Sequence, residues 1–212
     1  YEFAFHMKTS TEVGGDYYDF FPQDDESLYV VVGDATGHGL NAGMMVSITK
    51  AGLVSTPMDS PASIVKNLNR AIKFIDLGTT RMSLNMTKIK NGTLEFTSAG
   101  MPPGYLYRHK DKTVEEILIA GLPLGSMKEI DYDHRIFNVE SGDAFVLLSD
   151  GLPECVNHDD IMLDYDAILR CTQKNGHLNA QGIMDSLIDL GDSWMNGLMN
   201  EDDITLVVIK RK

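Results

Sequence analysis

The sequence has few cysteines, few basic residues and no long apolar run. Its 212 residues include only two cysteines, Cys155 and Cys171, which are too few for a disulfide framework and lack metal-site spacing. This usage fits a reducing cytoplasm. The longest apolar runs, such as residues 28–32, fall far short of the roughly 18 residues that cross a bilayer. The sequence therefore predicts neither a disulfide-stapled secreted domain nor a membrane span.

Basic residues are outnumbered by acidic ones. Lys and Arg number 18 against 31 Asp and Glu, which gives a formal net charge of −13. A long-range field of this sign repels phosphate backbones, so we expect no nucleic-acid partner. A solubilising surface explains most of the acidic excess, although carboxylates gathered at one site are also what hard divalent cations select.

The N-terminus lacks an initiating Met, a basic flank and an apolar signal core, so we expect a piece of a longer protein. A content of 43% hydrophobic and 23% charged residues is typical of a globular chain. Because soluble domains usually hold about 100–200 residues and no repeat or linker is visible, we predict one domain over residues 1–212.

Short apolar or alternating segments predict a fold rich in strands. The predicted strands cover residues 1–6, 17–21, 28–33, 83–89, 93–98, 104–107, 114–119, 133–139, 143–148 and 204–210. An Asn-Gly pair at residues 91–92 separates two of them and predicts a tight hairpin with antiparallel pairing.

Three segments have apolar residues at helical spacing. One follows a predicted N-cap at Ser60, and another follows a predicted cap at Asn179. The third covers residues 39–55, where close helix packing would explain Gly43 and Gly52. Strands that adjoin strands, with helices in separate blocks, favour an α+β fold over strict βαβ alternation.

Four acidic positions share one setting: each lies at or beside the end of an apolar strand, next to Gly or another acid. They are Asp16, Asp34, Asp150 and the pair Asp202–Asp203. An apolar strand holds its terminal side chain rigidly, and glycine lets the backbone bend enough to bring such ends together. Converging carboxylates need a counter-charge, and oxygen-only ligation favours Mg²⁺ or Mn²⁺ over zinc. For each position alone, ordinary turn chemistry is the simpler explanation.

Six motifs occur in an order that is far more specific than any one of them. They are residues 13–21, 33–39, 98–103, 121–125, 149–151 and 202–205. In this order they resemble the metal-dependent protein phosphatases of the sporulation stage II protein E group, bacterial relatives of the type 2C serine/threonine phosphatases. The resemblance covers essentially the whole chain. It implies an α/β/β/α sandwich of two antiparallel sheets flanked by helices, with a binuclear Mg²⁺ or Mn²⁺ centre at one sheet edge.

The resemblance also implies roles for single residues. Asp34 is similar to the carboxylate that bridges both metals, with the Ala35 carbonyl as a further ligand. Asp16 would hold one ion, whereas Asp150 and Asp202 would hold the other. Asp16, Asp34 and Asp150 are therefore the expected catalytic residues. Two cations would activate a water as the nucleophile, so that phosphate is released without a phospho-enzyme intermediate.

Three more residues are candidates near the site: Asp19 and Asp203 for orienting ligands or waters, and His38 as a proton donor to the leaving oxygen. A one-position error between Asp202 and Asp203 is left open. For His38 we favour a different explanation, in which residues 37–39 position the start of the following helix.

The chain departs from the family pattern in three places. Met101 stands where the family usually has a histidine, so any polar role of that histidine is absent. Ala35-Thr36 replaces the commoner Val-Ser, which matters little for a backbone ligand. Residues 153–158 match loosely, which leaves substrate contacts there open. Because no carboxylate ligand position is lost, we expect activity.

By resemblance, the protein is a phosphatase that hydrolyses phosphoserine or phosphothreonine in a protein substrate. The implied substrate is an anti-sigma-factor antagonist in bacterial signalling, and an upstream sensor domain is expected in the same chain. We expect this domain in the cytoplasm, with membrane attachment of the full-length protein left open. A homodimer is compatible with the sequence.

Two alternatives belong to other classes. Residues 37–42 fit the dinucleotide fingerprint G-x-G-x-x-G/A, but Asp34 lies where a pyrophosphate would approach. In addition, the helix predicted over residues 39–55 is followed by a second helix, where a dinucleotide-binding fold has a strand. The stronger alternative is a catalytically silent metal-binding signalling module that binds a partner protein, because a fold does not guarantee activity.

Overall fold

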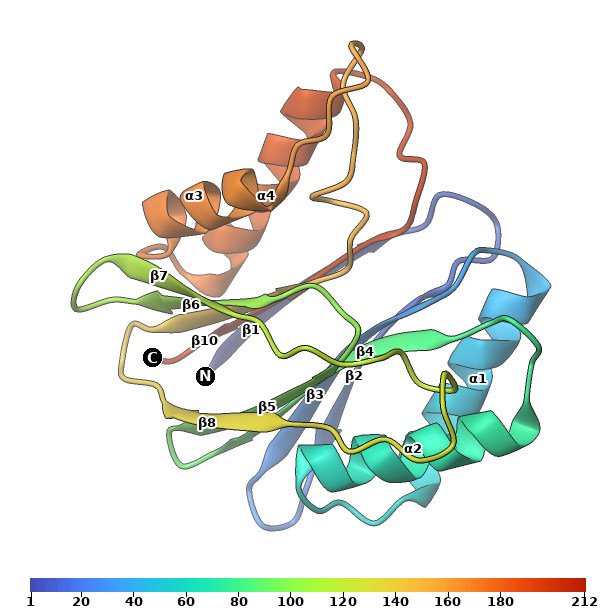
Figure 1. The fold of residues 1–212 in the computed structure, drawn as a ribbon. Coiled ribbons are helices and arrows are strands. Elements are labelled where there is room, and N and C mark those ends of the chain that lie inside the picture. The colour runs from blue at the N-terminus through green and yellow to red at the C-terminus, as the bar shows by residue number, and fades with distance from the viewer. The chain divides into compact units, whose positions relative to one another are not determined.

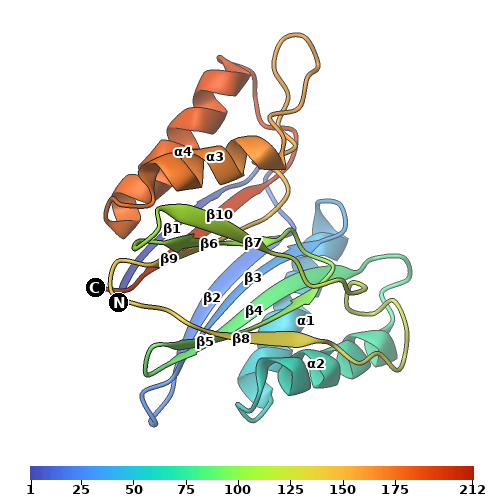
Figure 2. The same cartoon turned by 60° about the vertical axis from the view of Figure 1, so that its left-hand side comes forward.

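The computed structural model describes residues 1–212, which form two compact units. The terminal unit comprises Tyr1–Ser10, Pro102–Leu118 and Val139–Lys212, and the middle unit comprises Thr11–Met101 and Ile119–Asn138. Each unit contains a five-stranded antiparallel sheet and two helices (Figure 1, Figure 2). The predicted α+β class with two antiparallel sheets is therefore confirmed, whereas a single domain over residues 1–212 stays a prediction.

The middle unit holds a sheet with the strand order β2-β3-β4-β5-β8. Its elements are β2 (Asp16–Pro22), β3 (Leu28–Ala35), α1 (Leu40–Ser55), α2 (Pro61–Ile75), β4 (Met82–Lys90), β5 (Thr93–Ala99) and β8 (His134–Asn138). Asn91 and Gly92 join β4 to β5 with φ angles of 48° and 80°. Two positive φ angles are what the tightest hairpin turns require, so the predicted Asn-Gly hairpin is confirmed.

Helices α1 and α2 pack against the sheet of the middle unit. Met45 and Leu53 of α1 and Leu68 of α2 are fully buried in one apolar cluster with sheet residues such as Leu84. Gly52 lets the two helices approach, because a Cβ atom there would lie 2.5 Å from the Leu68 side chain. The predicted helix-packing role is confirmed for Gly52.

The terminal unit holds a sheet with the strand order β1-β10-β9-β6-β7. Its elements are β1 (Glu2–Lys8), β6 (Gly104–Arg108), β7 (Thr113–Ile117), β9 (Ala144–Leu148), α3 (Tyr165–Asn175), α4 (Ala180–Met195) and β10 (Ile204–Lys210). The first and last strands, β1 and β10, pair antiparallel, so both chain ends lie side by side (Figure 1). Apolar residues of α4, including Ile183 and Leu187, pack with Val146 and Leu206 of the sheet.

Both predicted helix caps are observed. At the start of α2, the Ser60 side chain accepts a hydrogen bond from the Ser63 amide. At the start of α4, the Asn179 side chain accepts one from the Gly182 amide. Helix α3 was not predicted, because only Ile168 and Thr172 are buried on it and most of its other residues are polar or charged.

The dinucleotide-binding alternative is wrong. Strand β3 is followed by two helices, and every strand pair in both sheets is antiparallel, so the parallel βαβ unit of that fold is absent from residues 1–212. No helix of the structure has the length and apolar character that crossing a bilayer requires.

Candidate functional site

The first pair of candidate ligands lies on adjacent strands of the middle unit. Asp16 opens β2, Asp34 lies near the end of β3, and the strand register places the two residues directly opposite each other. Cross-strand partners project from the same face of a sheet. The register therefore brings Asp16 and Asp34 together.

The spacing of this pair follows from the neighbouring hydrogen bond. The Ala35 amide donates to the Gly15 carbonyl at 3.0 Å, which makes that pair a hydrogen-bonded one. Pairs alternate along antiparallel strands, so Asp16 and Asp34 form the narrower, non-hydrogen-bonded type, whose Cβ atoms lie roughly 5 Å apart. Like charges directly opposite each other destabilise a sheet, and a cation would offset this repulsion.

The Ala35 carbonyl is positioned by the close approach of Gly15. A Cβ atom at residue 15 would lie 2.4 Å from the Ala35 oxygen and 2.9 Å from the Gly37 oxygen. Real Cβ atoms do not approach backbone oxygens so closely, so only glycine leaves these carbonyls in place. A backbone oxygen held beside two carboxylates is a suitable further ligand for a hard cation.

Other family-like motifs of the middle unit lie at the same end of its sheet. Ser83 of β4 pairs with Asp34, and Met82 forms a bridge with Leu124 in the 121–125 motif. A Cβ atom at Gly121 would lie 2.8 Å from the Ser98 carbonyl oxygen, so the 98–103 motif begins against the same segment. Motifs far apart in sequence thus meet around the end of β3 and the start of β4.

The second pair of candidate ligands belongs to the terminal unit. Asp150 follows β9, and Asp202 lies two residues before β10, the neighbouring strand of the sheet. Burial raises the pKa of the Asp150 carboxyl, and the nearby charges of Asp202 and Glu154 raise it further. The structure therefore brings Asp150 and Asp202 close enough to repel each other, which again favours a bound cation.

Asp202 and Asp203 have different environments. The Asp202 side chain is exposed, and one of its oxygens accepts the Asp203 amide at 2.8 Å. Asp203 is only 3% exposed, and its Oδ1 accepts the Ser10 amide at 2.7 Å. These contacts favour Asp202 as the residue that is available beside Asp150.

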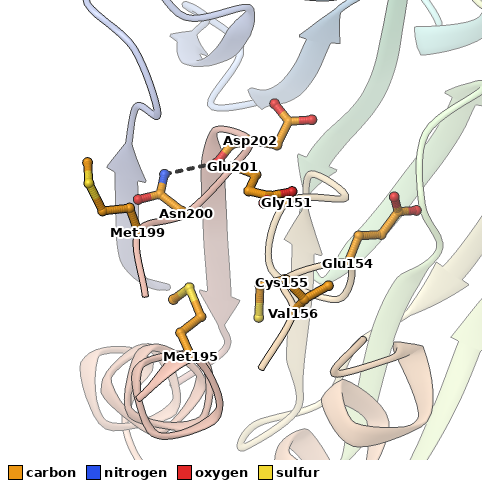
Figure 3. Close-up of a pocket in the computed structure, with 9 residues that line it drawn as sticks. All are labelled: Gly151, Glu154, Cys155, Val156, Met195, Met199, Asn200, Glu201 and Asp202. Carbon is orange, nitrogen blue, oxygen red and sulfur yellow. Dashed lines mark hydrogen bonds between the residues drawn. The ribbon is translucent and has the colours of Figure 1, made fainter. Parts of the chain in front are cut away.

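A pocket of about 220 Å³ adjoins the second pair. It is lined by Gly151, Glu154, Cys155, Val156, Met195, Met199, Asn200, Glu201 and Asp202 (Figure 3). The Asn200 amide group donates to the Asp202 carbonyl at 2.9 Å. The sulfur atoms of Cys155 and Met195 lie on the side away from the Glu154 and Asp202 carboxylates, and burial raises the pKa of the Cys155 thiol to about 11.

Glu154 was given no role by the sequence analysis. Its amide donates to the Asp150 carbonyl at 2.9 Å, and its carboxylate accepts the Tyr165 hydroxyl at 3.2 Å. The sequence signal that could have identified Glu154 was an acidic residue four positions after Asp150, in a tight turn. It adds a third negative charge near the second pair.

Asp19 and His38 lie apart from these pairs. Alternate strand residues point to opposite faces, so Asp19 projects from the face of β2 opposite to Asp16. There it accepts the Tyr17 hydroxyl at 2.7 Å and forms an ion pair with Lys50 of α1. His38 is exposed, next to the N-cap of α1 at Gly39.

The donor set fits a hard divalent cation, because it consists of carboxylate and carbonyl oxygens. Neither unit by itself gathers three or more His, Cys, Asp or Glu side chains into a metal-sized group. The acidic candidates of each unit form one pair: Asp16 and Asp34 in the middle unit, and Asp150 and Asp202 in the terminal unit.

Comparisons with known proteins agree with the sequence motifs. The sequence model of the family "Stage II sporulation protein E (SpoIIE)" matches residues 24–212. "Phosphoserine phosphatase RsbU" of Bacillus subtilis is 31% identical over 210 residues, which cover 95% of this chain and 60% of that protein. The chain thus spans less than two thirds of the length of this relative.

Solved structures show the same fold at lower identity. The "SiaA-PP2C domain of Pseudomonas aeruginosa" has a TM-score of 0.87 and 19% identity, covering 99% of this chain and 85% of that chain. "RsbX in complex with magnesium" has a TM-score of 0.73 and 18% identity, covering 97% and 92%. The fold class implied by the resemblance is therefore confirmed, and the family match over most of the sequence shows that this chain belongs to the SpoIIE family.

Proposed function

We propose that this chain is the catalytic region of a Mg²⁺- or Mn²⁺-dependent phosphoprotein phosphatase that hydrolyses phosphoserine or phosphothreonine. The observation that carries the proposal is the directly opposed pair Asp16 and Asp34, with the Ala35 carbonyl held beside it by Gly15. Two like charges and a fixed backbone oxygen at a strand end fit a divalent cation better than a structural turn.

In the proposed site, Asp16, Asp34 and the Ala35 carbonyl would hold metal from the middle unit. Asp150 and Asp202 provide the ligands of the terminal unit. By its similarity to the family motif, Asp34 would contribute to the binding of both ions. When bound, two such ions lower the pKa of a water and stabilise the negative charge of an in-line displacement at phosphorus.

The remaining roles concern position and charge. Burial and the charges of Asp202 and Glu154 raise the pKa of Asp150, which supports the proposal because a bound cation would favour the ionised carboxyl. Asp203 is assigned to orient Asp202. His38 stays a prediction as a proton donor, and the present contacts of Asp19 support a role in holding α1 against β2 instead of one at the metal.

The proposed substrate is a phosphorylated protein of the anti-sigma-factor antagonist class. Support comes from the similarity to RsbU, whose name specifies phosphoserine, over 95% of this chain. An upstream sensor domain, a homodimer and attachment of the full-length protein to a membrane are parts of the same proposal.

The test is phosphate release with Mn²⁺, using an aryl phosphate and a serine-phosphorylated antagonist protein as parallel substrates. We expect turnover by the wild type and a loss of at least 100-fold in Asp34→Asn and Asp150→Asn, because each change removes a charged ligand. The matched control is Asp143→Asn, which changes a buried aspartate at the other end of β9.

The two substrates separate two parts of the proposal. Faster hydrolysis of the phosphoprotein than of the aryl phosphate supports a dedicated partner, because remote binding contacts then contribute to catalysis. No turnover of either substrate at any Mn²⁺ concentration, with metal still bound, would instead support the silent signalling module.

A further inference from the structure

Asp203 is a buried acid that links three segments of the terminal unit. Its Oδ1 accepts the Ser10 amide at 2.7 Å and the Ser10 hydroxyl at 3.3 Å. Ser10 lies two residues after the end of β1 and 193 residues from Asp203 in sequence. Burial of a carboxylate is costly without hydrogen-bond donors, so these contacts tie the end of β1 to the segment before β10.

The backbone of Asp203 contacts the residues around both candidate ligands of this unit. Its amide donates to the Asp202 carboxylate at 2.8 Å, which orients that side chain. Its carbonyl accepts the Ser149 hydroxyl at 3.4 Å, next to Asp150. A Cβ atom at Gly151 would lie 2.0 Å from the same carbonyl oxygen, so the backbone directly after Asp150 is packed against Asp203.

We infer that Ser10 and Asp203 form a clamp that positions Asp202 for metal binding. In this role Asp203 is a positioning residue: its carboxylate holds the segment by hydrogen bonds from Ser10, and its own amide then fixes the Asp202 carboxylate. The inference rests on the proposed function, because it requires Asp202 to be a ligand. It adds the end of β1 to the parts of the chain that set metal affinity.

The test compares Asp203→Ala with Asp203→Asn in the whole chain. An asparagine Oδ1 can still accept both Ser10 hydrogen bonds, whereas alanine cannot. We expect Asp203→Ala to raise the Mn²⁺ Kd about 10-fold or more and Asp203→Asn to raise it less than about threefold, since partners that orient metal ligands typically change affinity 10- to 100-fold. The Kd is read from the electron paramagnetic resonance signal of free Mn²⁺.

A matched control separates clamping from general destabilisation. Asp143 is 4% exposed in the same unit, and its carboxylate accepts the His109 and Glu140 amides at 2.9 and 3.0 Å. It precedes β9, whereas Asp150 follows that strand. We expect Asp143→Ala to lower the melting temperature while leaving the Mn²⁺ Kd within twofold of the wild type.

Each outcome decides between specific alternatives. An unchanged Kd in Asp203→Ala overturns the clamp, and an equal loss in Asp203→Asn and Asp203→Ala overturns it in favour of direct ligation by Asp203. If Asp203→Ala does not fold, Ser149→Ala removes the hydroxyl that binds the Asp203 carbonyl, and its Kd should rise about threefold or more. A wild type that binds no Mn²⁺ overturns the proposed function and the clamp together.

Discussion

At the scale of single residues, the candidate site depends on close backbone approach as much as on carboxylates. Gly15 packs against the Ala35 carbonyl, and Gly151 packs against the Asp203 carbonyl. Neither glycine has a positive φ angle, so the space that a missing Cβ leaves is what matters at both positions. Each pair of acids thus has a glycine that keeps a nearby backbone oxygen in place.

Gly15→Ala therefore tests the middle-unit ligands. The new methyl group would meet the Ala35 oxygen at 2.4 Å, and the backbone must shift to relieve this contact. We expect the Mn²⁺ Kd to rise about 10-fold or more, because the Ala35 oxygen, a proposed metal ligand, moves. Isothermal titration calorimetry gives the Kd.

The control for this change is Gly43→Ala in α1. Its methyl group would meet only the Val13 side chain, at 2.8 Å, and a side chain can move more easily than a backbone carbonyl. Equal Mn²⁺ affinities for Gly15→Ala and the wild type would contradict the role of the Ala35 carbonyl.

At the scale of elements, helix α2 anchors the loop that follows the 121–125 motif. Asn69 is fully buried on this helix, and its amide oxygen accepts the Gly125 amide at 2.9 Å. Its amide nitrogen donates to the Met127 carbonyl at 3.0 Å. The Asn69 side chain thus forms hydrogen bonds with two backbone groups of this loop that are not paired with a neighbouring strand.

Asn69→Leu should destabilise the protein by about 1–3 kcal/mol, because the Gly125 amide and the Met127 carbonyl lose a buried partner. Urea unfolding measures the free energy of unfolding. Asn67→Leu on the exposed face of α2 is the control and should change it by about 0.5 kcal/mol or less. Equal effects at the two positions would show that the hydrogen bonds of Asn69 contribute nothing to the free energy of unfolding.

At the scale of the whole molecule, the net charge of −13 and the two proposed pairs of ligand carboxylates lead us to expect that a bound cation stabilises the folded chain. A cation that binds only the folded chain stabilises it by about 2.7 kcal/mol per site at 100 times its Kd. For a chain of this length, that corresponds to a rise in melting temperature of roughly 5–10 °C.

Differential scanning calorimetry with EDTA and then with Mn²⁺ measures this rise. Asp34→Asn should show a much smaller one, since it lacks the proposed bridging charge. An identical melting temperature for the wild type in EDTA and in Mn²⁺ would contradict metal binding to the folded chain.

The local elements were largely predictable from the sequence, because caps and turns are short-range features. Ser60 and Asn179 cap the helices as predicted, and Asn91-Gly92 forms the predicted hairpin. Helix α3 was missed because its buried face is small. The interleaving of the two units was also not visible, because sheet partners come from distant parts of the chain.

The sequence by itself determined which acidic residues lie at or beside the ends of strands. Through the ordered motifs, it also determined which family the chain belongs to. Only the tertiary structure decided that Asp34 faces Asp16, that Asp203 is buried while Asp202 is exposed, and that Asp19 projects from the other face of β2. The physical reason is strand register: a shift of one residue turns every side chain to the opposite face, and long-range pairing and burial fix the register.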